Sequence, residues 1–370
     1  IMPGDLPDSI TELILGDTFN QPLKPGSIPE SVTTLWLGNL YDHQLEQGII
    51  PSKVKSLWLG WSYAHLLHPG ILPSTLQSLH TGGFDNLLST PGILPPSLTS
   101  LCLAEFTQHL APGILPASLT TLELGNYFNR DIEPGILPTR LLYLKIGNRF
   151  NGRLMLGSLP QSLLKLKFGY NFNQVLSPGV LPASLQTLIL SQEYNHPLEP
   201  STLPSSLKRI SFGISFRQEL SQDNLPSSIT SIFYSENLFQ LATPDVIHHC
   251  PMIKRLELSI ATNLNHPRCD NIMPSKAQLS MGNVHSLALC LPPRHMTSNH
   301  GYTNFVQRCL DTDIPNIIIL PSNYYIKGEQ GIIRRVDNNI MLVVDSSSRL
   351  HFITQDILFN HCGNIFKDVL

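Results

Sequence analysis

The stretch "PGILPASLTTLELGNYFN", from Pro112 to Asn129, returns along the chain in altered copies, among them "PGSIPESVTTLWLGNLYD" and "PGVLPASLQTLILSQEYN". The proline of each "LP" or "IP" dipeptide marks one copy, and successive markers lie 22 residues apart except for one interval of 21. The markers are Pro7, Pro29, Pro51, Pro73, Pro95, Pro116, Pro138, Pro160, Pro182, Pro204 and Pro226. Self-similarity at a short fixed period indicates a solenoid, in which each repeat packs on its neighbours.

Aliphatic residues follow each marker at fixed distances. One stands three residues after the marker, another six after it and usually a third eight after it, as in Leu119, Leu122 and Leu124. This is the LxxLxL core of leucine-rich repeats. Side chains alternate between the two faces of a strand, so the second and third aliphatic residues share one face. The pattern therefore predicts one short parallel strand per repeat, with its aliphatic face buried.

The remainder of each unit predicts a turn and a return leg without a helix. A glycine usually follows the strand, as at Gly125, where a Cβ would hinder the turn. An aromatic residue such as Phe128 then enters the core, and the adjacent Asn129 is expected to bond loop backbone groups from inside, one rung per repeat. The return leg "PGxLP" excludes a helix through its two prolines. We expect a mostly non-helical convex side and modest curvature.

The repeats change character in the last third of the chain. From about residue 242 the core motif continues in "IKRLELS", "VHSLALC" and "IPNIIIL", but the periods lengthen to 31 and 30 residues. The inserted segments, such as "NFVQRCLD" from Asn304, have helical spacing and predict short outer helices. Two alternating apolar runs flank Asp345 to Ser348, which predicts a hairpin that caps the last rung.

The expected fold class is therefore an α/β repeat solenoid, leucine-rich-repeat-like, with one parallel strand per repeat. Longer, partly helical repeats and a β-hairpin cap are expected at its C-terminal end. The predicted domains are 22-residue repeats over 1–241, longer leucine-rich-like repeats over 242–330 and the C-terminal β-hairpin cap over 331–370.

Two units carry a more specific signature. The units "FNQPLKPGSIP" (Phe19 to Pro29) and "FNQVLSPGVLP" (Phe172 to Pro182) contain the F-N-Q and I-P elements of the FNIP repeat. Over residues 1–241 the chain resembles this family of leucine-rich-repeat proteins, which is abundant in social amoebae and giant DNA viruses. Viral members often place an F-box before the repeats. The resemblance thus implies substrate recognition for a ubiquitin ligase. The opening "IMPGDLP" matches the tail of a repeat, and Skp1 and cullin machinery would bind through a region upstream of it.

Composition and motifs narrow the classes of function. The formal net charge of -3 argues against a nucleic-acid binder, and no apolar run approaches the roughly 18 residues of a membrane helix. No GxSxG, HExxH, GxxxxGK[ST] or GxGxxG occurs, so we expect neither an enzyme nor a cofactor. The spacing of His248, Cys250, His361 and Cys362 fits no standard zinc pattern, so no metal site is expected.

The cysteines bear on localisation. None of the six lies in a CxxC pair, and we interpret them as reduced thiols of a cytoplasmic protein, in the host cytoplasm or the virion if the protein is viral. An extracellular disulfide set is the alternative interpretation. A surface carbohydrate binder would require those oxidised cysteines and a secretion leader.

Outward-facing strand positions are free to serve recognition, because the core does not need them. Seven residues after their markers, Trp36, Trp58 and His80 fall in one column on successive strands, and Trp61 follows Trp58 closely. Exposed tryptophans are costly to leave in water and are frequent in binding hot spots. We predict that these four residues are anchors for a protein partner. Mutual stacking of the tryptophans, or cover by an upstream segment, is the alternative.

A second cluster lies farther along the same predicted face. Its members are Glu123, Tyr143, Lys145, Lys165, Lys167 and Tyr170. Lysines on neighbouring rungs repel each other weakly, so the cluster is either a strip for an acidic ligand or a set of solvated charges balanced by Glu123. Together the clusters predict a concave surface of a non-enzymatic protein-recognition module. The alternative hypothesis is a structural component of a virion or other assembly.

Overall fold

The computed structural model describes residues 1–82, 90–221 and 223–235, together with six later strands. These strands are β12 (Arg255–Ser259), β13 (Ser286–Leu291), β14 (Asn316–Pro321), β15 (Gly331–Arg335), β16 (Ile340–Val344) and β17 (Leu350–Thr354). The chain divides into two compact units, residues 1–196 and 197–370.

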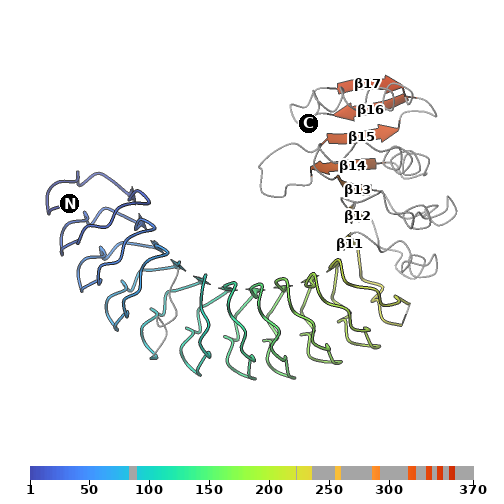
Figure 1. The fold of residues 1–370 in the computed structure, drawn as a ribbon, viewed down its shortest axis with the longest axis horizontal. Helices are drawn as coiled ribbons and strands as arrows, with labels where there is room; N and C mark the ends of the chain where they lie inside the picture. Colours follow the sequence, from blue (N-terminus) through green and yellow to red (C-terminus); the bar gives the residue numbers. More distant parts are fainter. Residues whose placement is uncertain are drawn as a thin grey trace. The chain divides into compact units, whose positions relative to one another are not determined.

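In the first unit, successive turns of chain are stacked side by side (Figure 1). Its described residues form nine short strands, each parallel to the next. They are β1 (Glu12–Ile14), β2 (Thr34–Trp36), β3 (Ser56–Leu59), β4 (Ser78–Thr81), β5 (Ser100–Leu103), β6 (Thr121–Leu124), β7 (Tyr143–Lys145), β8 (Lys165–Lys167) and β9 (Thr187–Ile189). The prediction of one parallel strand per repeat is confirmed.

The buried core consists of columns of equivalent side chains. Leu119 and Leu122 are fully buried, and each has a counterpart in the next repeat. A stack of nearly parallel rings runs beside the aliphatic columns, with centroids 6.1 Å apart between Phe106 and Phe128 and 5.9 Å apart between Phe128 and Phe150. Phe106 belongs to the repeat that is one residue short. The shorter turn therefore still places its ring against that of the next repeat.

At the glycine that follows most of the strands, a Cβ would clash as predicted, and the atoms that it would meet belong to the preceding repeat. Gly147 does not need an unusual backbone conformation; a Cβ there would lie 1.8 Å from the carbonyl oxygen of Gly125 in the preceding repeat. A side chain is thus excluded by the close approach of two neighbouring repeats. The glycine that requires left-handed backbone is the one in the return leg, such as Gly113 with a φ of 79°.

The asparagine ladder exists, but its predicted location inside the core is wrong. The Oδ1 atom of Asn129 accepts a hydrogen bond of 2.9 Å from the backbone N–H of Asn151, and Asn151 accepts one from Asn173 in the same way. These side chains are exposed or half-buried. The preceding aromatic ring fills the core, and the next residue of an extended backbone points the other way. The ladder therefore joins neighbouring repeats along an outer edge.

A second ladder of hydroxyl groups was not predicted. Two residues after the marker, the Oγ of Ser118 donates to the carbonyl oxygen of Leu98 over 2.6 Å, and Ser162 donates to Leu141 over the same distance. Both serines are half-buried, and each carbonyl belongs to the first core aliphatic residue of the preceding repeat. These bonds satisfy backbone oxygens at the point where the chain enters the strand.

The second unit begins with further parallel strands and ends with antiparallel ones. Strands β10 (Arg209–Phe212) and β11 (Ser231–Ser235) are followed by β12, β13 and β14, all parallel and in register. Strands β16 and β17 pair antiparallel, as predicted for the runs around Asp345 to Ser348. An additional strand, β15, pairs with both β14 and β16.

The described repeats have turns and extended segments on their return legs, and no helix occurs among the described residues. The helices predicted between the later strands, including the segment from Asn304, lie outside those residues. Likewise, within the part of the chain that the structure describes, no helix has the length and apolar character to cross a membrane.

Candidate protein-binding face

The outward side chains of β1 to β9 form what we call the strand face. Strand residues alternate between buried and half-exposed positions, as in Thr121–Leu124. Pairing in register brings one outward residue from each strand into a single row. The row consists of Ile14, Trp36, Trp58, His80, Cys102, Glu123, Lys145, Lys167 and Ile189.

The tryptophans at one end of the row pack on each other. The ring centroids of Trp36 and Trp58 are 4.7 Å apart and the rings are tilted by 37°. Trp58 is half-buried by this contact, whereas Trp36 keeps 41% of its surface exposed. Mutual stacking therefore covers part of the pair and leaves an apolar surface open. Ile14, which pairs with Trp36 and is 58% exposed, extends that surface. Its position seven residues after a marker puts it in the same outward row, although it is not among the predicted site residues.

Trp61 lies outside the row. It follows Gly60 in the turn after β3 and is 52% exposed. Tyr170 follows Gly169 in the corresponding turn after β8 and is also exposed. The structure thus places these two predicted site residues at the end of their strands, along an edge of the strand face.

His80 and Cys102 occupy the middle of the row, with the Nε2 atom 3.9 Å from the sulfur. Burial lowers the pKa of His80, and Lys145 lowers it further against the opposing effect of Glu123. Burial and the charge of Glu123 raise the pKa of the Cys102 thiol to about 11. At neutral pH this geometry favours a neutral thiol beside a neutral imidazole, and not the thiolate that a nucleophilic cysteine requires.

Glu123 and Lys145 form an ion pair on neighbouring strands. The Nζ of Lys145 lies 2.7 Å from Oε2 of Glu123, and both side chains are partly exposed. Burial acts to lower the pKa of Lys145, but the hydrogen bond and the charge of Glu123 outweigh burial, and the pKa is raised. Glu123 therefore neutralises Lys145, the nearest of the three lysines.

Lys165 and Lys167 lack such a partner. Within the described residues, neither ammonium group has a carboxylate oxygen within salt-bridge distance. Burial lowers the pKa of Lys167, and the positive charges of Lys145 and Lys165 lower it further. The ammonium group of Lys165 lies 5.1 Å from the centroid of the Tyr143 ring, which holds it by a cation–π contact. This part of the strand face carries uncompensated positive charge.

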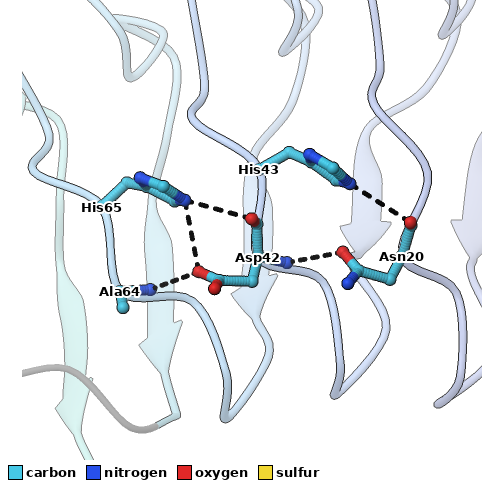
Figure 2. A network of polar contacts seen from close by, with 5 residues as sticks. All are labelled: Asn20, Asp42, His43, Ala64 and His65. Atoms are coloured by element: carbon cyan, nitrogen blue, oxygen red, sulfur yellow. Dashed lines mark hydrogen bonds and ion pairs between the residues drawn. The ribbon is translucent and has the colours of Figure 1, made fainter.

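A polar network on another edge of the first unit has a structural role. Figure 2 shows that His43 and His65 reach from neighbouring turns toward the preceding repeat. The Nε2 of His43 is 3.2 Å from the carbonyl oxygen of Asn20, and that of His65 is 3.1 Å from the carbonyl oxygen and 3.3 Å from Oδ1 of Asp42. These polar atoms already join neighbouring repeats.

Metal ligands do not gather in the described part of the chain: no group of three or more His, Cys, Asp or Glu side chains there could hold an ion. The His248, Cys250, His361 and Cys362 positions considered in the sequence lie outside the described residues. Among the described side chains, Cys102 is a free cysteine.

Parallel strands in register, buried LxxLxL side chains and a non-helical return leg define a leucine-rich-repeat-like β-solenoid. The chain belongs to the FNIP repeat family. The family pattern, described as FNIP Repeat, matches residues 1–40, 41–84, 86–127, 106–149, 128–170, 150–193 and 194–236. The family resemblance inferred from the sequence is thereby confirmed.

The chain is also similar to a solved structure, the crystal structure of CroV588, which is described as a novel circular LRR protein structure. The two chains share 28% identity with a TM-score of 0.64, over 77% of this chain and 40% of CroV588. The match thus spans less than half the length of that protein. No curated protein is similar enough to this chain to count as a relative. A repeat solenoid that resembles a leucine-rich-repeat protein fits a role in protein interaction.

Proposed function

We propose that the chain is a non-enzymatic protein-recognition module that binds another protein through the strand face. Trp36, Trp58 and His80 supply the central contacts and Trp61 the contact at the edge. The second part of the proposed site comprises Glu123, Tyr143, Lys145, Lys165, Lys167 and Tyr170. The observation that carries this proposal is the Trp36–Trp58 pair, which presents open aromatic surface on a sheet whose core does not require it.

The physical support comes from the repeat architecture. Stacked repeats create an extended surface with one outward side chain per rung, and such surfaces serve recognition in solenoid proteins. We further propose that residues 1–241 carry this surface, that residues 242–330 extend the solenoid and that residues 331–370 cap it. The cytoplasm is the proposed location, because reduced cysteines such as Cys102 suit that compartment.

A finer proposal concerns the cellular partner. The F-box that precedes the repeats in viral members of the family supports a role as the substrate-recognition part of a ubiquitin-ligase adaptor, in contact with Skp1 and cullin proteins. A structural component of a virion or other assembly is the competing function. Purification of the natural full-length protein from its host, followed by mass spectrometry, tests the two. Recovery with Skp1 and cullin proteins supports the adaptor, and recovery only with intact particles contradicts it.

The recognition face is tested by the double substitution Trp36→Ala and Trp58→Ala. Truncation of paired aromatic anchors costs about 2 kcal/mol or more, so affinity for the co-purified partner should fall by about 30-fold or more, measured by titration of the purified proteins. The melting temperature should change by no more than a few degrees, because both side chains lie outside the core.

Met155→Ala with Leu156→Ala is the matched control, since these residues are 43% and 74% exposed on a return leg away from the strands. This control variant should retain full affinity. Unchanged affinity in the tryptophan variant, or an equal loss in the control, contradicts the proposed binding face.

A further inference from the structure

We infer that the partner presents an extended acidic segment, which crosses the strands with an apolar residue against Trp36 and Trp58 and with Asp or Glu side chains against Lys165 and Lys167. The inference rests on the proposed function and specifies the chemistry of the partner. Its starting point is the unequal distribution of apolar surface and charge along one row of the strand face.

The apolar end of the row is preformed. Trp36 and Trp58 hold each other through their ring contact, and exposed Ile14 continues the same surface. An apolar side chain of a partner can therefore bury aromatic area here without first ordering these residues, which favours binding. His80 and Cys102, the next two residues of the row, are half-buried. They offer a neutral stretch over which an extended backbone can pass.

The charged part of the row, with Lys165 beside it on β8, selects for negative charge. Glu123 is already bonded to Lys145, and its attraction for Lys167 is outweighed by the repulsion from Lys145 and Lys165. Lys165 is held over the ring of Tyr143, and Lys167 stands beside Lys145 in the row. A carboxylate placed between Lys165 and Lys167 would relieve their mutual repulsion and gain two charge-assisted hydrogen bonds. A basic or neutral segment would leave the repulsion in place.

The distance between the two ends sets the spacing within the partner. Trp58 lies on β3 and Lys167 on β8, which are five strand intervals apart. Neighbouring strands are about 4.8 Å apart, so the separation is about 24 Å. An extended chain advances about 3.3 Å per residue and covers that distance in about seven residues. The partner segment should therefore carry its acidic residues about six to eight positions from its apolar residue.

Selection from a library of random 16-residue peptides displayed on phage tests this inference with the purified full chain. The expected result on the wild-type protein is enrichment of an aromatic or aliphatic residue about six to eight positions from Asp or Glu. The variant Lys165→Glu with Lys167→Glu should instead enrich Lys or Arg at the same spacing. The control variant Lys24→Glu with Lys53→Glu, at exposed positions off the strand face, should select the wild-type pattern.

The winning peptide is then synthesised with a fluorescent label and titrated against each variant by polarisation. Its affinity should fall at least about tenfold in the tryptophan double variant and in the β8 charge-reversal variant. Selection without acidic enrichment, or the same pattern on the charge-reversed protein, overturns the inference, as does a failure to select any peptide. If capture of the natural partner still requires Trp36 and Trp58 in that case, the strand face binds a folded surface and the proposed function stands without the acidic segment.

Discussion

At the scale of single residues, the buried aromatic position of the repeat is correlated with the residue two positions later, which the packing of the core alone does not require. Wherever this residue is tyrosine in the first unit, a histidine stands two positions later. The pairs are Tyr41 with His43, Tyr63 with His65 and Tyr194 with His196, with ring centroids 5.7 to 6.0 Å apart in nearly perpendicular orientation. Edge-to-face contact is a favourable geometry for aromatic rings. The histidine thus covers the tyrosine ring while its Nε2 reaches the preceding repeat.

The buried tyrosines predict a loss of stability at alkaline pH. Burial raises the pKa of Tyr63 and of Tyr194 to about 12, against an ordinary value near 10, although backbone hydrogen bonds act to lower it. Because the folded state holds these protons more tightly than the unfolded state, their stabilising contribution is complete below pH 10 and is lost as the pH rises toward 12. Urea titrations at a series of pH values should show stability falling by up to about 3 kcal/mol per tyrosine over this range.

The variant Tyr63→Phe with Tyr194→Phe provides the control. Phenylalanine occupies the equivalent position in Phe128 and Phe150, so the variant should fold, and its stability should decline less between pH 10 and 12. A decline as steep as that of the wild type would mean that these two hydroxyl groups are not the source of the alkaline sensitivity.

Residue-scale features differed in how well the sequence predicted them. The buried leucines and aromatic rings follow from period alone, because a side chain repeated every 22 residues must meet its own copy. The exposed position of Asn129 and the role of Ser118 did not follow, since each bonds to backbone of a different repeat. The row of the strand face follows from the repeat register, but the ion pair that separates Lys145 from the other lysines depends on side-chain geometry.

At the scale of strands, the alternation of faces predicts costs of different size for two residues on adjacent strands. Leu144 in β7 is fully buried, whereas Glu123 in β6 points outward and is partly exposed. Leu144→Ala should lower the free energy of unfolding by about 2–5 kcal/mol because it leaves a cavity. Glu123→Ala removes an exposed ion pair and should cost no more than about 1 kcal/mol. Denaturant melts of both variants measure the difference, and equal costs would contradict the assignment of faces.

Strand registers were predicted well and the C-terminal strands only in part. Leu256 pairs with Ile232 and Leu287 with Leu256, as the LxxLxL spacing requires. The hairpin of β16 and β17 has the alternating pattern of a strand pair. The sequence of β15, "GIIRR", is too short to show a clear alternation of apolar and polar residues. The pairing of β15 with β14 depends on tertiary structure, which the local sequence does not encode.

At the scale of the whole molecule, nearest-neighbour packing predicts that one repeat can be removed if the period is kept. Deletion of residues 150–171 joins Arg149 to Phe172 and removes one 22-residue turn, including β8. Each repeat packs on its neighbours and equivalent positions replace one another, so the shortened protein should unfold cooperatively with a moderately lower melting temperature. Circular dichroism during thermal unfolding measures both properties.

Deletion of the 11 residues 150–160 is the comparison for that experiment. It removes half a turn, so the buried side chains of one repeat would be placed against exposed positions of the next. The protein should therefore lose its cooperative unfolding transition. If both shortened proteins behave alike, the repeats are not interchangeable units of packing.

The close approach at Gly147, where the backbone of one repeat lies against that of the next, has a consequence for how such proteins diversify. It fixes the step between rungs while leaving the outward residue of each rung unconstrained. A gene that gains or loses one repeat between Trp58 and Lys167 would change the distance between the aromatic and basic ends by one strand interval and leave both ends chemically intact. Unequal recombination can therefore change the length of the preferred ligand by one strand interval at a time, without any substitution at the contact residues.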